Sequence, residues 1–361
     1  MSTDTKHNIY SHLKLVAPHP KTGQRLHYPQ PPGSADAWLL AAMARQSKQT
    51  IVVLTAEPLQ AQRLLQEISL VDHDLRVRTL PDWETLPYDG FSPHQDLVSE
   101  RLRTLYALTQ NDVDVLTVPI TTAQYRLAPR PFLAAYTFDF KQKDRLDEAA
   151  LREQLMLSNY SHVSQVTAPG EFSLRGGLVD LFPMGSAVPY RLDLFDDEIE
   201  SIRAFDVDTQ RTLYPVHSVQ LLPGREFPLD ETSRNQFRSR FREVFEGDPS
   251  RTQLYKDVGN GIAFAGIEYY LPLFFEETAT LFDYLKPNTL IVSSGDLESA
   301  MLQFMRDTVN RYEFLKHDLE RPVLPPEALF LKPEAVFEQL KPFARLALTA
   351  PSANAPNLDI N

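Results

Sequence analysis

The stretch of sequence that decides the fold is RGGLVDLFP, residues 175–183, followed closely by YRLDLFDDEI, residues 190–199. In both segments polar and apolar residues alternate, which predicts two short strands, and each strand carries one arginine among apolar neighbours. The second strand runs into a row of acids. No catalytic constellation accompanies the two strands. The pattern therefore favours a charged recognition surface on a small sheet, and a binding module over an enzyme.

Alternation along the second strand places Arg191, Asp193 and Phe195 on one face of the sheet. Leu192 and Leu194 then point to the opposite face, toward the core. A guanidinium group makes bidentate bonds with carboxylates, and arginine and aromatic side chains are common in interface hot spots. An arginine, an acid and an exposed phenylalanine together are more typical of an interface than of a solvated surface.

Arg175, at the end of the first strand, is the other candidate contact residue. The alternative interpretation is internal pairing, in which Arg175 and Arg191 bind Asp180 or Asp193 and serve only the fold. The residues alone leave both interpretations open.

Length and composition limit the classes of function. The chain has 361 residues, which suggests two or three domains. Its 48 acidic and 36 basic residues give a net charge of −12, which disfavours non-specific attraction to nucleic-acid phosphates. The absence of cysteine excludes disulfides and thiolate sites and fits a reducing compartment. Without a signal peptide or an apolar span, we expect a soluble, cytoplasmic protein.

Two regions in which predicted helices and strands alternate flank a middle region with a different pattern, one helix followed by short strands. The first 35 residues are polar and rich in proline, which predicts an entry loop. Residues 36–133 then alternate helix and strand around the apolar run 50–55, which is typical of a buried parallel strand in a three-layer α/β unit. We expect helices at 36–45, 59–70 and 96–109, and strands at 50–55, 75–80 and 114–119.

The middle region, residues 134–223, holds eight basic and fourteen acidic residues, a balance of −6, and is predicted to be an α+β insertion. Its expected elements are a helix at 147–159 and strands at 162–167, 172–174, 178–182, 189–195 and 199–206. The α/β texture returns in 224–348, with helices at 229–245, 281–285 and 296–315 and a strand at 288–293. Residues 349–361 are polar and unpatterned, as in a linker.

Motifs for nucleotide or metal chemistry are missing. A phosphate-binding loop needs glycines and a lysine before a helix, but the nearest stretch, 31–38, has no lysine and contains Asp36, which would repel phosphate. The nine histidines do not pair with acids at metal-binding spacing. The acids that follow Phe195 are typical of a solvated turn. We therefore expect no catalytic, cofactor-binding or metal-binding residues.

A second unusual segment, residues 80–93, contains three prolines, three aromatic residues and three acids between a strand and a helix. It predicts a rigid, packed connection with Trp83 in the core. Its acids argue against a platform for single-stranded DNA, which interleaves aromatic with basic residues.

Several of these segments resemble the N-terminal portion of the bacterial transcription-repair coupling factors, the Mfd family. The resemblance runs from about Leu39 to Leu348. The matching segments are 82–89, 91–96, 175–176, 181–185, 189–193, 195–199, 205–208, 210–212 and 266–269.

The resemblance implies a module similar to the damage-recognition protein UvrB. A split α/β domain would consist of 1a (36–133) and 1b (224–348), and domain 2 (134–223) would recruit UvrA. The family's contact residues fall on Arg175, Arg191 and Phe195, with Asp193 on the same strand. The phosphate-binding loop and DNA-inserting hairpin of UvrB have no counterpart here.

In full-length family members, further domains bind RNA polymerase and double-stranded DNA, a motor uses ATP and Mg²⁺, and a C-terminal domain masks domain 2. The resemblance therefore implies a non-enzymatic adaptor that links stalled RNA polymerase to nucleotide excision repair through UvrA. A diverged nucleic-acid-dependent ATPase and a DNA-binding module are the alternatives.

Overall fold

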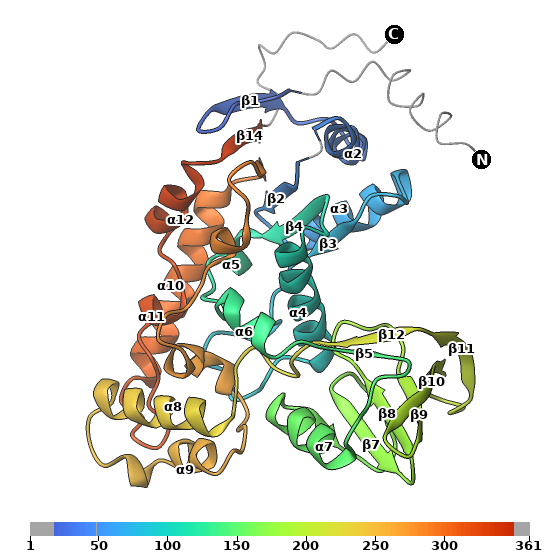
Figure 1. Ribbon diagram of the computed structural model, residues 1–361. Helices are drawn as coiled ribbons and strands as arrows, with labels where there is room; N and C mark the ends of the chain where they lie inside the picture. Colours follow the sequence, from blue (N-terminus) through green and yellow to red (C-terminus); the bar gives the residue numbers. More distant parts are fainter. Residues whose placement is uncertain (1–17, 48, 350–361) are drawn as a thin grey trace, which may run out of the picture.

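The computed structural model describes residues 18–47 and 49–349, and a six-stranded parallel sheet forms one end of it (Figure 1). The strand order is β1-β14-β13-β2-β4-β3, and all five neighbouring pairs are parallel. The strands are β1 (Arg25–Pro29), β2 (Ile51–Thr55), β3 (Val77–Thr79), β4 (Val115–Pro119), β13 (Leu290–Ser294) and β14 (Ala344–Thr349). The sheet thus combines strands from both sides of the middle region.

Helices cover both faces of the parallel sheet. Every residue of β2 is therefore buried, and alternate residues of the strand belong to two different hydrophobic cores. Ile51 and Val53 pack with α2 (Ala35–Ser47) and α3 (Pro58–Val71). Val52 and Leu54 belong to the larger cluster that includes α4 (Gln95–Gln110) and α10 (Leu297–Leu315). The prediction of a three-layer α/β unit with a parallel sheet is confirmed.

The interpretation of the first 35 residues as a loop is wrong where β1 forms. Leu26 and Tyr28 pack against the buried cluster under α2, and β1 pairs with β14 at the edge of the sheet. Pro29 suggested a loop, but proline is tolerated at the edge of a sheet, where its missing N–H removes no ladder bond. Residues 1–17, also assigned to this loop, lie outside the described residues, as does the predicted linker after Thr349.

The middle of the chain forms a second six-stranded sheet, whose order is β11-β10-β9-β8-β7-β6. Neighbouring strands are antiparallel except for β6 and β7. The strands are β6 (Ser161–His162), β7 (Glu171–Arg175), β8 (Leu178–Phe182), β9 (Tyr190–Phe195), β10 (Glu198–Phe205) and β11 (Thr212–Val216). Helix α7 (Glu148–Leu157) precedes this sheet, and β5 (Phe138–Lys141) pairs with β12 (Ser218–Leu221) beside it.

The predicted strand at 162–167 is mostly wrong. Only Ser161 and His162 pair, because the chain then turns and Val166 is buried with Phe182 and Phe205 in a separate small cluster.

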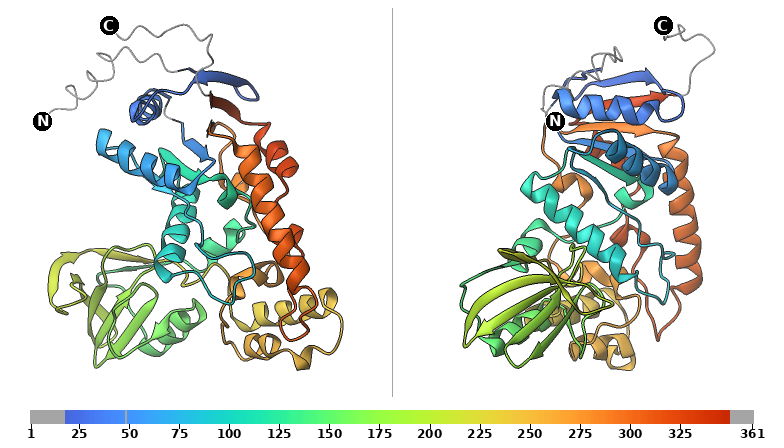
Figure 2. Two further views of the ribbon diagram at one scale, coloured as in Figure 1. Left: turned by 180° about the vertical axis from the view of Figure 1, so that it is seen from behind. Right: turned by 90° about the vertical axis from the view of Figure 1, so that its right-hand side faces the viewer.

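The remaining helices lie between the second sheet and the end of the chain, or connect β4 to β5. They are α5 (Ile120–Ala123), α6 (Arg130–Ala135), α8 (Glu231–Val244), η1 (Pro249–Arg251), α9 (Gln253–Gly259), η2 (Ile267–Phe274), η3 (Leu281–Tyr284), α11 (Pro326–Leu329) and α12 (Pro333–Leu340). Helices α8 and α9 and the antiparallel sheet both lie at the end of the molecule opposite β1, on different sides of it (Figures 1 and 2).

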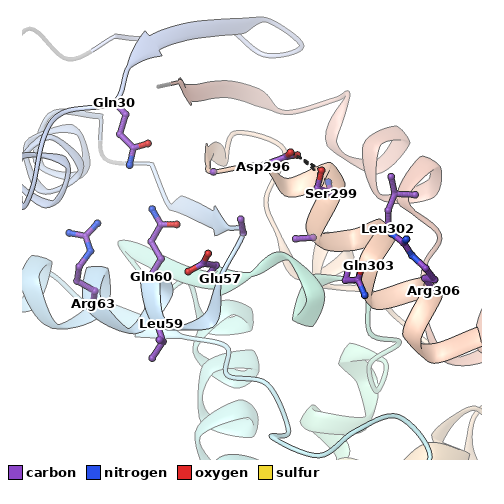
Figure 3. A pocket seen from close by; sticks show the side chains of 13 residues that line it. Gln30, Glu57, Leu59, Gln60, Arg63, Asp296, Ser299, Leu302, Gln303 and Arg306 are labelled. Carbon is purple, nitrogen blue, oxygen red and sulfur yellow. Dashed lines mark hydrogen bonds between the residues drawn. The ribbon is translucent and has the colours of Figure 1, made fainter. Parts of the chain in front are cut away.

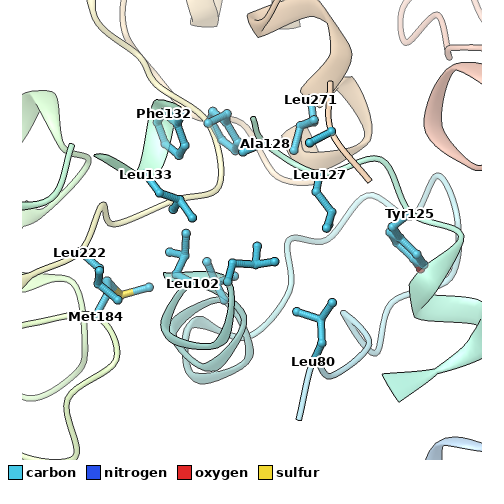
Figure 4. Close-up of a cluster of buried hydrophobic side chains, with 14 of the residues drawn as sticks. Leu80, Leu102, Tyr125, Leu127, Ala128, Phe132, Leu133, Met184, Leu222 and Leu271 are labelled. Carbon is cyan, nitrogen blue, oxygen red and sulfur yellow. The ribbon is translucent and has the colours of Figure 1, made fainter. Parts of the chain in front are cut away.

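The antiparallel sheet is fixed to α4 by apolar and polar contacts. Met184 and Leu222 join the buried cluster around Leu102 (Figure 4). The amide of Gly185 donates to Ser99 Oγ of α4 at 2.6 Å, and the carbonyl of Gly224 accepts from Gln95 Nε2 at 3.1 Å. These contacts favour a fixed orientation of the sheet relative to α4 over a flexible tether.

The segment 80–93 packs as the sequence predicts. Trp83 is buried, and its Nε1 donates to Glu226 Oε1 at 3.3 Å. Glu226 also forms a fully buried ion pair with Arg101 of α4, whose Nε lies 2.5 Å from the carboxylate. The rings of Tyr125 and Tyr269 meet Trp83 edge-on at 4.9 and 5.5 Å. This connection therefore joins the two sheets through one buried cluster.

Candidate partner-docking face

Two tight turns bring the ends of β7 and β9 together. Gly176 and Gly177 form the two-residue turn between β7 and β8, with φ of 54° and 82°, the backbone that a type I′ turn requires. The amide of Leu194 donates to the carbonyl of Gly177 at 2.7 Å, so this turn lies beside the end of β9. Arg175 and Phe195 consequently lie at the same end of the sheet.

A buried carboxylate organises the two arginines. Asp180 of β8 is only 1% exposed and lies directly opposite Arg191 of β9. It accepts from Arg191 Nε at 2.6 Å and Nη2 at 2.8 Å, and from Arg175 Nη2 at 2.8 Å. The hydrogen bonds to Asp180 raise the pKa of the Arg191 guanidinium, although burial alone would lower it. Arg191 therefore stays charged and fixed in orientation.

The two arginines differ in how much of each remains accessible. The Arg191 side chain is 18% exposed, its Nη1 donates to the carbonyl of Gln210 at 3.3 Å, and its guanidinium lies 4.9 Å from the centre of the Phe205 ring. The Arg175 side chain is 52% exposed and makes one bond to Asp180. Internal pairing accounts for most of the Arg191 guanidinium, whereas Arg175 keeps free donors.

Phe195 and Asp193 complete the face. Phe195 is 71% exposed at the end of β9, beside Asp196, whose φ of 53° begins the turn to β10. Asp193 accepts a short hydrogen bond from Ser201 Oγ on β10. Leu192 is fully buried on the other side, as the alternation predicts. We call Arg175, Asp180, Arg191, Asp193 and Phe195 the docking face.

Sequence reasoning missed the supporting residues of this face. Ser201 lies opposite Asp193 only because the register shifts between Ile199 and Ser201, whereas a regular hairpin of β9 and β10 would have placed Glu200 there. The contacts of Arg191 with Gln210 and Phe205 depend on the next turn and had no signal in the sequence. Leu213 and Tyr214, both exposed at an irregularity in the pairing of edge strand β11, were missed because β11 was not predicted.

A separate cleft of about 960 Å³ opens at the carboxyl ends of β2 and β13 (Figure 3). Ligands of parallel α/β sheets bind at such an edge. Charged side chains of both signs line this cleft, and no lysine is among them: Glu57, Asp296, Arg63 and Arg306. Near it, the buried Asp36 at the start of α2 forms an ion pair with Arg63 at 2.5 Å. The cleft therefore lacks the lysine of a phosphate-binding loop, and Asp36 already pairs with one of its two arginines.

The described ranges, residues 18–47 and 49–349, contain no group of three or more histidine, aspartate or glutamate side chains that could hold a metal ion. Within the same ranges no helix is both long and apolar enough to span a bilayer.

Comparison with known proteins identifies the class of the middle region first. Residues 138–227 match the family model of the UvrB interaction domain, and this match contains the whole docking face.

The chain as a whole is similar to transcription-repair-coupling factors. It is 45% identical over 329 residues to that of Escherichia coli, which covers 91% of this chain and 29% of the relative. The factor of Haemophilus influenzae is 45% identical over 322 residues, covering 88% of this chain and 28% of the relative. That of Bacillus subtilis is 27% identical over 278 residues, covering 72% and 23%. The resemblance stated from the sequence is confirmed, and the chain spans less than a third of the length of these relatives.

Proposed function

We propose that this chain docks UvrA through the docking face and itself catalyses no reaction. One observation carries the proposal: the accessible Phe195 and Arg175 lie at the same end of one sheet, within the residues that match the UvrB interaction domain. In this role the chain is the UvrA-recruiting part of a transcription-repair coupling factor.

The side chains of the docking face have different roles in this proposal. Phe195 is the anchor, because burying an exposed aromatic side chain contributes about 1.5–3 kcal/mol to association. Arg175 supplies free donors for a carboxylate or carbonyl of the partner. Asp180 and Arg191 hold Arg175 in place before binding, which lowers the entropy cost of ordering it. Asp193 adds an acceptor beside Phe195.

The finer arrangement is part of the proposal. Residues 36–133 and 224–348 would be the halves 1a and 1b of one helicase-like domain without nucleotide chemistry, and residues 134–223 would be domain 2. The shared parallel sheet, built from strands on both sides of the insertion, supports this division. Contacts with RNA polymerase, the motor's own contacts with double-stranded DNA, and use of ATP and Mg²⁺ would belong to parts of the full-length protein outside this chain.

The proposal that the chain binds no cofactor rests on the absence of a lysine from the residues that line the cleft and on the commitment of Arg63 to Asp36. A thermal shift with MgATP provides the check. Stabilisation that saturates with nucleotide would favour the alternative of a diverged ATPase.

Calorimetric titration of UvrA with this chain tests the docking proposal. We expect Phe195→Ala to weaken binding at least about 30-fold, the equivalent of about 2 kcal/mol, without a change in the circular dichroism melting curve. Leu213→Ala is the matched control, because it removes an exposed apolar side chain from the same sheet outside the docking face. Absence of binding by the unmodified chain would overturn the proposal.

A second titration examines masking. If a C-terminal domain covers the docking face, UvrA should bind this chain more tightly than it binds the full-length protein. Equal affinities would argue against masking.

A further inference from the structure

Helix α8 differs from the rest of this acidic protein. It carries four arginines, Arg234, Arg238, Arg240 and Arg242, and only two glutamates, whereas the whole chain has a net charge of −12. In the described part of the chain none of these four arginines forms an ion pair with a carboxylate, although arginines elsewhere commonly do. Helix α8 is therefore a local concentration of unneutralised positive charge.

Three of the arginines form a row along one flank of α8. Arg234, Arg238 and Arg242 recur at intervals of four residues, so successive members are separated by about 6 Å along the axis. All three contact α9 or its end. Arg234 Nη1 donates to the carbonyl of Gly259 at 3.4 Å, and Arg242 Nη1 donates to Tyr255 Oη at 3.0 Å. The Arg238 guanidinium lies 5.1 Å from the centre of the Tyr255 ring.

These contacts orient the arginines without neutralising them, because a carbonyl, a hydroxyl and an aromatic ring carry no net charge. Capping the carboxyl end of α9 needs only Arg234. It does not explain why Arg238 and Arg242 continue the row. Because these side chains are already ordered, little side-chain entropy would be lost when the row of cations binds an anion, which favours binding.

We propose that Arg234, Arg238 and Arg242 bind the phosphate backbone of double-stranded nucleic acid. A duplex offers a continuous line of charge, about one per 1.7 Å of axis, which matches a row of cations better than an isolated carboxylate does. Recognition of single strands needs aromatic faces for stacking, but Tyr255 is buried beneath Arg238. The surface is an electrostatic one that reads no base sequence.

This surface is separate from the docking face. Helix α8 and the antiparallel sheet lie on opposite sides of the molecule in Figure 1 and in the view from behind in Figure 2. A duplex on α8 therefore leaves Phe195 and Arg175 accessible, and the inference does not depend on the proposed docking of UvrA.

The test is fluorescence anisotropy of a labelled 25-base-pair duplex with the whole chain, from 50 to 200 mM salt. With three phosphate contacts, affinity should fall about 40-fold over this range, and the double variant Arg238→Ala/Arg242→Ala should reduce that fall to about 4-fold. The control, Arg152→Ala/Lys332→Ala, also removes two exposed cations. Arg152 lies in α7 and Lys332 directly precedes α12, so the control should bind the duplex as the unmodified chain does. Circular dichroism melting shows whether each variant is folded.

Failure to bind the duplex at 50 mM salt, or equal salt dependence of the two double variants, would overturn the inference. So would preferential binding of polyglutamate, which would assign α8 to an acidic protein instead. Because Arg238 packs on Tyr255, Arg242→Glu provides a second variant at a more exposed position. It should lower affinity more than Arg152→Glu does.

Discussion

Replacing Asp180 with asparagine should weaken the hydrogen bonds that hold Arg191 and Arg175 in the docking face, and should lower the free energy of unfolding. The carboxylate accepts three charge-assisted hydrogen bonds from Arg191 and Arg175 at 2.6–2.8 Å and is almost fully buried. Asparagine keeps one acceptor oxygen but places an amide group opposite arginine donors, so at least one of the three bonds is lost. Removing one partner from a fully buried pair costs about 3–5 kcal/mol. Because Arg175 is half-exposed, we expect about 2–3 kcal/mol here.

Urea denaturation followed by circular dichroism measures this loss for Asp180→Asn, Arg191→Ala and the double variant. The two single changes should not add, because both break the same bonds, and the coupling free energy should exceed about 1 kcal/mol. A loss below about 0.5 kcal/mol for Asp180→Asn, or strict additivity, would refute the role assigned to this carboxylate.

Two further predictions concern the scaffold. Gly224→Ala should destabilise the protein by about 3 kcal/mol in urea denaturation, because the added Cβ would lie 2.5 Å from the backbone oxygen of Asn159. Gly176→Ala should cost only about 1 kcal/mol, because a Cβ there meets no atom within 4 Å and only the φ of 54° is unfavourable. Equal losses of stability in the two variants would contradict this reasoning. Burial opposes ionisation of Asp114, but hydrogen bonds from Arg76 outweigh burial and lower the pKa of the Asp114 carboxyl. The ionised carboxylate therefore stabilises the fold at pH values above the ordinary pKa of 3.8, and this stabilisation is lost as the pH falls below that value. Asp114→Asn should therefore lower the urea midpoint at pH 7 and have a smaller effect at pH 3, and an equal effect at both pH values would exclude this ion pair as the cause.

The parallel sheet could be predicted from the sequence where its strands are buried on both faces. The apolar run that became β2 has no other stable location, so its position followed from composition alone. β1 and β14 were both missed: Pro29 concealed β1, and the short run that forms β14 was not recognised although Pro342 marks a turn just before it. Edge and late strands depend on pairing with distant segments, which local patterns do not record.

The sequence indicated which residues lie on the docking face, but not which of them pair with each other and which remain accessible. Alternation placed Arg191, Asp193 and Phe195 on one face, and the same pattern left internal pairing with Asp180 open. Only the register of β8 against β9 determines that Asp180 lies opposite Arg191 and takes up most of its guanidinium. The whole-chain charge likewise concealed the arginine row on α8, because an average over 361 residues does not describe one helix.

The most direct test of the docking proposal is amide hydrogen exchange of this chain with and without UvrA, read by mass spectrometry. The turn amides at Gly176, Gly177 and Asp196 lie at the tip of the docking face, and such exposed turns exchange rapidly in a free protein. Slower exchange in peptides that cover 175–178 and 193–198 when UvrA is bound, with no change in α10, is the predicted result. Protection confined to α10, or no protection at all, would contradict the assignment of UvrA binding to this face.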